Sequence, residues 1–122
     1  MGVRLREPVA VFAGGCLGTL ARAGLAEALP AGAGGWPWAT FTANLLGAFA
    51  LGWVAATLHR GRRRAFLATG VCGALTTFST FQLELLELLD RGRAATAAGY
   101  GATSLALGLA AVLLGRRLAV GR

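Results

Sequence analysis

Long apolar runs with almost no charged residues divide this chain of 122 residues. Only 14% of the residues are charged, and they gather between the runs and at the two ends. Each run is close to 20 residues long, which is the length an α-helix needs to cross about 30 Å of hydrocarbon. The pattern predicts an all-α membrane protein, with a single domain over residues 1–122 and four transmembrane helices at about 9–29, 38–58, 66–89 and 94–114.

The distribution of basic residues predicts how the chain sits in the membrane. All twelve are arginines, and they flank the apolar runs instead of forming a basic stripe on a soluble fold, so we expect no nucleic-acid partner. Nine lie on one side of the predicted bundle, in the two tails and in the loop at residues 59–64, and two lie on the other. The positive-inside rule therefore places both termini in the cytoplasm. The lack of lysine and the excess of alanine and glycine are typical of a GC-rich genome, which suggests a bacterium. We therefore expect the chain to lie in the lipid of a bacterial plasma (inner) membrane.

The third run contains the segment TTFSTF at residues 76–81. A single Ser or Thr in a membrane helix usually bonds back to a carbonyl one turn earlier. Four hydroxyls together beside Gly73 instead predict a local break in the helix, and membrane proteins tolerate a break where it lines a cavity or binds an ion. Phe78 and Phe81 are three residues apart, so both rings leave one face, either as core packing or as part of that cavity.

The other runs contribute isolated polar groups. Thr40 and Asn44 are four residues apart and share one face, and the amide of Asn44 must find a partner in hydrocarbon, where its NH₂ is a good anion donor. Tyr100 and Ser104 belong to a polar stripe that either faces another helix or lines a path. Arg22 has no carboxylate partner one turn away, so it snorkels or holds a water-filled vestibule.

These polar groups favour a small anion as the ligand. They are hydroxyls, one amide and aromatic rings, and no carboxylate or His accompanies them before Glu84. A proton-coupled carrier needs a titratable group in the membrane, and a cation site prefers acidic or carbonyl rings. Phenylalanine edges carry partial positive charge and can contribute to an anion path. No nucleophile–base pair or metal cluster can be assembled, so we do not expect an enzyme.

Glycines and polar residues form one motif in each run. The motifs are Gly14-Gly15-x-x-Gly18-x-x-x-Arg22, Thr40-x-x-x-Asn44-x-x-Gly47, Gly73-x-x-Thr76-Thr77-Phe78-Ser79-Thr80-Phe81 and Tyr100-x-x-x-Ser104. In this order they resemble the small bacterial fluoride channels of the Fluc or CrcB family. The resemblance covers all four runs, and the motif of the third run is quite specific.

The resemblance implies an antiparallel dimer with two pores, through which fluoride leaves the cytoplasm passively and its toxicity is relieved. In that pattern Asn44 would donate to fluoride, and Phe78 and Phe81 would form the aromatic gate. A structural sodium ion at the dimer interface would be held by the backbone carbonyls of Gly73 and Thr76 from both subunits. The remaining implied residues are Thr40 and Thr80 of the pore, the polar track of Tyr100 and Ser104, and Arg22 at the vestibule.

Three alternatives stay open. Gly108 stands where the family often continues the polar track with a third polar residue, which favours a non-conducting partner subunit of a heterodimeric channel. The nine-to-two arginine distribution conflicts with one chain inserting in both orientations, so the partner is either a second copy or an oppositely oriented paralogue. A small proton-coupled multidrug exporter would need a carboxylate deep in the first run, whereas Glu27 lies near that run's end.

Overall fold

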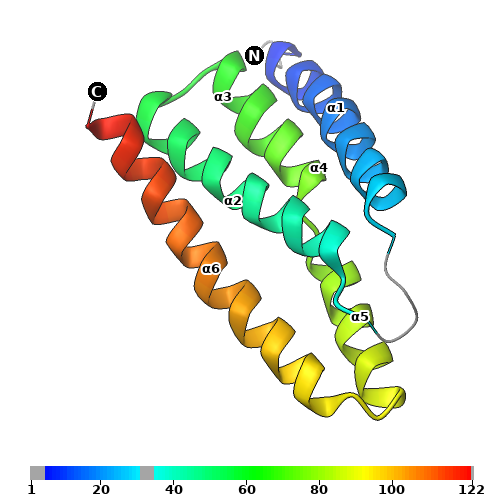
Figure 1. Ribbon diagram of the computed structural model, residues 1–122. Helices are drawn as coiled ribbons and strands as arrows, with labels where there is room; N and C mark the ends of the chain where they lie inside the picture. Colours follow the sequence, from blue (N-terminus) through cyan, green and yellow to red (C-terminus); the bar gives the residue numbers. More distant parts are fainter. Residues whose placement is uncertain (1–4, 31–34, 122) are drawn as a thin grey trace.

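The computed structural model describes residues 5–30 and 35–121, which form helices joined by short connections (Figure 1). Four helical spans are long and apolar enough to cross a membrane, and the third of them covers Arg62–Asp90 in several consecutive pieces. This confirms the all-α, four-span prediction. In chain order the elements are α1 (Arg6–Ala28), α2 (Trp38–Thr57), α3 (Arg62–Arg64), the π-helical segment η1 (Ala65–Cys72), α4 (Gly73–Leu75), α5 (Phe78–Asp90) and α6 (Ala94–Val120).

Local chemistry explains where the helices begin and end. Pro8 lies in the first turn of α1, where a missing N–H breaks no helical hydrogen bond, and Pro30 follows soon after its last residue. Gly61 and Gly92 have φ angles of 107° and 73°, which glycine adopts without steric cost, and they form the turns before α3 and α6. Both α1 and α6 extend beyond the apolar runs, because a helix can continue through the polar interface where arginines are solvated.

The spans pack in two pairs (Figure 1). Helices α2 and α6 run side by side, and α1 lies against η1 and α4. Helix α5 continues the third span and contacts α6. The beginning of α1, the short helix α3 and the end of α6 lie at one end of the bundle, and the turn between α5 and α6 lies at the other (Figure 1).

Glycines bring helix backbones into direct contact at two places, which we call the glycine interfaces. Between α1 and η1, a Cβ added at Gly14 or Gly18 would collide with backbone carbonyls of the π-helical segment. Between α2 and α6, Gly52 and Gly115 each lie against a backbone carbonyl of the facing helix. Small residues allow this close approach in lipid, where no hydrophobic effect drives helices together. Gly14 and Gly18 therefore allow α1 to pack directly against the backbone of the third span.

The third span is interrupted at Thr76 and Thr77. Their backbone angles, φ −79° and ψ 150° for the first and φ −148° and ψ 121° for the second, are extended rather than helical. The hydroxyl of Thr77 accepts a hydrogen bond from the N–H of Thr80 and so caps the start of α5. The hydroxyl of Thr76 bonds back to the carbonyl of Cys72, as an ordinary helical threonine does. The predicted helix break is confirmed, and its hydroxyls largely stabilise it.

Candidate ion-conduction site

Asn44 of α2 joins its helix to the break in the third span. Its Oδ1 accepts from the N–H of Thr77 at 2.8 Å, and its Nδ2 donates to the carbonyl of Thr77 at 3.2 Å. This pairing fixes the orientation of the amide, since only the oxygen can accept and only the nitrogen can donate. One of the two Nδ2 hydrogens is used in this way. The other remains available to an acceptor beside the break.

Several carbonyls of the third span lose their helical partners at the break, among them those of Gly73 and Thr76. In an unbroken helix the N–H of Thr77 would donate to the carbonyl of Gly73, but it donates to Asn44 Oδ1. Likewise, the N–H of Thr80 would donate to the carbonyl of Thr76, but it donates to Thr77 Oγ1. Carbonyls released where a membrane helix unwinds are ligands of the kind that sodium takes.

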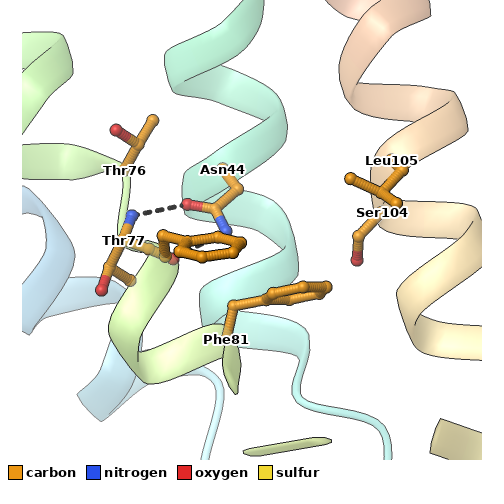
Figure 2. Close-up of a pocket in the computed structure, with 7 residues that line it drawn as sticks. Asn44, Thr76, Thr77, Phe81, Ser104 and Leu105 are labelled. Carbon is orange, nitrogen blue, oxygen red and sulfur yellow. Dashed lines mark hydrogen bonds between the residues drawn. The ribbon is translucent and has the colours of Figure 1, made fainter. Parts of the chain in front are cut away.

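A cavity of about 240 Å³ lies beside the break, and we call it the central cavity (Figure 2). Ser104 lines it, and the Oγ of Ser104 is buried and has no hydrogen-bond partner among the described residues. In Figure 2 this hydroxyl and the ring of Phe81 are directed toward the same space. A buried hydroxyl without a partner costs about 1–3 kcal/mol, so a ligand that accepts its hydrogen bond would remove that cost. The lining residues are all uncharged: Asn44, Thr76, Thr77, Phe78, Phe81, Ser104 and Leu105.

The two phenylalanines of α5 line the central cavity together. Their ring centroids are 6.0 Å apart and their planes differ by 28°, so the rings are nearly parallel and turn their positive edges in similar directions. Their exposure differs greatly, because Phe81 is 7% exposed and Phe78 is 68% exposed. Phe81 is thus held by the chain itself, whereas Phe78 lies on the open side of the cavity.

A second pocket, of about 280 Å³, brings Arg22 together with Thr40 and Thr80. Thr77 lines both this pocket and the central cavity, so the two spaces approach each other at the break. The guanidinium of Arg22 forms no hydrogen bond or ion pair within the described part of the chain. Thr80 Oγ1 accepts from Thr77 Oγ1 at 3.1 Å, which leaves the Thr80 hydroxyl hydrogen free. The pocket therefore offers positive charge and a hydroxyl donor, as a vestibule for an anion requires.

Tyr100 lies behind the central cavity instead of lining it. Its side chain is 0% exposed, its ring centroid is 5.1 Å from that of Phe81, and its hydroxyl donates to Glu84 Oε1 at 3.1 Å. The other oxygen of Glu84 accepts from Thr40 Oγ1, also at 3.1 Å. One carboxylate therefore holds hydroxyls from α2 and α6. The structure separates the predicted polar track, because Ser104 faces the cavity and Tyr100 supports the ring of Phe81.

Glu84 is the residue of this region to which the sequence assigned no role. A signal was present, since an ionisable residue inside a membrane span is a functional candidate by default. Glu84 also follows Phe81 by three residues, which places both side chains on one face of α5. Its two partners lie 44 and 16 residues away in the chain. No local pattern could identify them.

These features define a class of protein: a multi-pass helical membrane protein with a broken helix and an uncharged cavity suited to an ion. The family model described as "CrcB-like protein, Camphor Resistance (CrcB)" matches residues 9–116. The chain belongs to this CrcB family.

Proteins of known name are similar in sequence to this chain over most of its length. It is 48% identical over 118 residues to "Fluoride-specific ion channel FluC 1" of Mycolicibacterium paratuberculosis, covering 93% of this chain and 89% of that protein. It is 46% identical over 114 residues to the protein of the same name from Mycobacterium tuberculosis, covering 89% and 86%. It is 42% identical over 120 residues to "Fluoride-specific ion channel FluC" of Chlorobaculum tepidum, covering 94% and 95%. The family is one of ion channels, which points away from an enzyme.

Proposed function

We propose that this chain is a subunit of a fluoride-specific channel, through which fluoride leaves the bacterial cytoplasm passively and its toxicity is relieved. The observation that carries the proposal is the buried, unpartnered hydroxyl of Ser104 in a cavity that has no charged lining residue. Fluoride is small and accepts strong hydrogen bonds, so it can use this donor without a compensating cation. The names of the relatives support the same ion.

The proposed path begins in the pocket of Arg22, where Thr40 and Thr80 also lie. The guanidinium would raise the local concentration of anions by electrostatic attraction. Near Thr77 the ion would pass to the free Nδ2 hydrogen of Asn44 and enter the central cavity.

Within the central cavity the ion would lie between Ser104 Oγ and the ring edges of Phe78 and Phe81, which form the proposed aromatic gate. Tyr100 and Glu84 would act as positioning residues, because they hold Phe81 and the beginning of the path without lining the cavity. In this proposal no residue is catalytic, and residues 1–122 form one channel domain.

We further propose a structural sodium ion at the helix break. The released carbonyls of Gly73 and Thr76 would be its ligands, and the same two carbonyls of a second subunit would complete the set. The residues fit the ion, since sodium takes hard oxygen ligands from unwound backbone. Replacing sodium by N-methylglucamine should lower the thermal unfolding temperature of the purified assembly. An unchanged temperature would contradict this assignment.

The proposed assembly is an antiparallel dimer. A cavity with polar lining cannot face lipid without an energetic cost. Phe78, which is 68% exposed, lies at the open side of this cavity. A second chain would cover that side. The arginine distribution favours an oppositely oriented paralogue as the partner, with both termini of this chain in the cytoplasm and the chain in the bacterial plasma membrane. A stable, fluoride-conducting dimer from this chain expressed alone would show that a second copy suffices.

The test is ion efflux from liposomes that contain the purified chain, alone or with a co-expressed partner. We expect fluoride efflux and no measurable chloride efflux. Phe81→Ile should reduce fluoride efflux by roughly tenfold, because the ring edge is worth on the order of 1.4 kcal/mol. Phe41→Ile is the matched control, since Phe41 also packs near Tyr100 but lines neither pocket. Equal efflux in all three proteins would refute the assigned path, and equal efflux of both ions would refute fluoride specificity.

A further inference from the structure

A pocket at the end of the bundle that carries α3 has no part in the proposed ion path. Its volume is about 480 Å³, and it lies between the first turns of α1 and the start of the third span. The lining combines two guanidinium groups with apolar side chains: Ala10, Arg62, Arg63, Phe66 and Leu67. We call it the arginine pocket.

The two arginines of this pocket have no partner in the part of the chain that the structure describes. Neither Arg62 nor Arg63 forms a hydrogen bond or an ion pair with a side chain of residues 5–30 or 35–121. Their neighbour Arg64 differs, because its Nη1 donates to the carbonyls of Leu58 at 2.9 Å and His59 at 3.0 Å and so closes the preceding loop. The guanidinium groups of Arg62 and Arg63 are thus available to an anion from outside. Guanidinium matches the geometry of phosphate oxygens.

The apolar part of the pocket lies on the membrane side of the arginines. Phe66 follows Arg62 by four residues and Leu67 follows Arg63 by four, so each apolar side chain lies about one helical turn below a guanidinium. Ala10 of α1 adds a third apolar side chain to the lining. A free anion would use only the arginines. A phospholipid would contact both parts, with its phosphate group on the arginines and an acyl chain on the apolar side chains below.

The position of the arginine pocket relative to the membrane agrees with a polar part above and an apolar part below. The arginine pocket is lined by residues from the first turns of α1 and the start of the third span. In Figure 1 the beginning of α1 and the short helix α3 lie at the same bundle end as the end of α6. Nine of the twelve arginines belong to the tails and loop of this side, which therefore faces an anionic leaflet. The apolar spans begin directly below, so the guanidinium groups lie at the depth of the lipid headgroups.

We propose that the arginine pocket binds an anionic phospholipid. The headgroup phosphate lies between Arg62 and Arg63, and the first acyl carbons lie on Phe66 and Leu67. The bound lipid ties the start of the third span to α1 at the leaflet surface. The inference is independent of the transported ion, because none of these residues lines the central cavity or the pocket of Arg22.

The test measures lipid binding to the purified chain in neutral detergent, by native mass spectrometry and by thermal unfolding. Phosphatidylglycerol is titrated against phosphatidylcholine with the same acyl chains. The wild type should bind phosphatidylglycerol preferentially and unfold at a higher temperature with it. The double variant Arg62→Gln/Arg63→Gln should bind phosphatidylglycerol roughly thirtyfold more weakly. Each arginine near an anionic headgroup strengthens binding by a factor of about five to six, and the two factors multiply.

Arg116→Gln/Arg117→Gln is the matched control, because it removes the same charge at the same bundle end without touching the pocket. It should retain the phosphatidylglycerol affinity to within about threefold. Equal losses in the two double variants would mean non-specific surface attraction and would overturn the proposal. It would also be overturned if inorganic phosphate alone gave the same thermal shift, which would indicate a free-anion site, or if the wild type did not distinguish the two lipids.

Discussion

At the glycine interfaces the helices touch through their backbones, whereas at the central cavity side chains hold them apart. Gly14, Gly18, Gly52 and Gly115 leave no space for even a methyl group. A few residues away, Asn44 and the break leave about 240 Å³ that the chain itself does not fill. Both regions lie within the membrane spans, so the difference comes from the local sequence and not from the surroundings.

The contrast shows how this small protein can be rigid and still hold a space for an ion. Membrane helices pack most tightly through small residues, and the contacts of α1 with η1 and of α2 with α6 are of this kind. The third span belongs to both regions, since its first half packs against α1 and its break opens to the cavity. The glycine interfaces therefore fix the position of the break, and Asn44 and Glu84 arrange the polar groups around it.

The largest effect should come from filling a glycine interface. In Gly14→Val, the new side chain would meet the backbone carbonyl of Phe66, which cannot move without shifting the third span. We expect a loss of stability of about 3 kcal/mol or more, seen as aggregation or a lower unfolding temperature. Gly15→Val is the control, since nothing lies within 4 Å of a Cβ at Gly15. Equal behaviour of the two variants would show that the α1–η1 contact is not tight.

A loss of transport, with the fold kept, should follow from placing a charge beside the cavity. In Asn44→Asp, the carboxylate can still accept from Thr77 N–H but loses the Nδ2 donor and repels an anion. At an effective dielectric of about 20, the repulsion over about 4 Å is roughly 4 kcal/mol, so fluoride efflux should fall by roughly a hundred- to a thousandfold. Gln82→Glu makes the same chemical change at an exposed position of α5 and should leave efflux intact. Undiminished efflux in Asn44→Asp would remove Asn44 from the path.

The smallest effect concerns the carboxylate behind the cavity. In Glu84→Gln, one carboxylate oxygen becomes an NH₂ group, so the hydroxyl of either Thr40 or Tyr100 loses its acceptor. We expect thermal unfolding to show a destabilisation of about 1 to 2 kcal/mol, because hydrogen bonds to a charged group are the stronger kind. Glu87→Gln, at an exposed position one turn later, should change stability little. If both variants had the same stability, Glu84 would not hold these two hydroxyls together.

The number of spans, the break and the close approach at Gly14 and Gly18 could be predicted from the sequence, because each depends on local composition. Apolar length determines a span, and four neighbouring hydroxyls beside Gly73 indicate a break. The meeting of Asn44, Phe81 and Ser104 in one cavity agrees with the predicted pore residues, although their roles stay predictions. The exclusion of Tyr100 from that cavity could not be predicted, since it depends on Glu84, 16 residues away.

The central claim is that the unpartnered hydroxyl of Ser104 is a donor to the permeating ion. It is tested most directly by fluoride efflux from liposomes with Ser104→Ala, compared with Ser79→Ala. Ser79 is exposed and lines neither pocket, so its variant makes the same chemical change outside the path. Loss of one hydrogen bond to an ion should slow fluoride efflux by roughly ten- to a hundredfold in Ser104→Ala and leave Ser79→Ala at the wild-type rate. Wild-type efflux from Ser104→Ala would contradict the account.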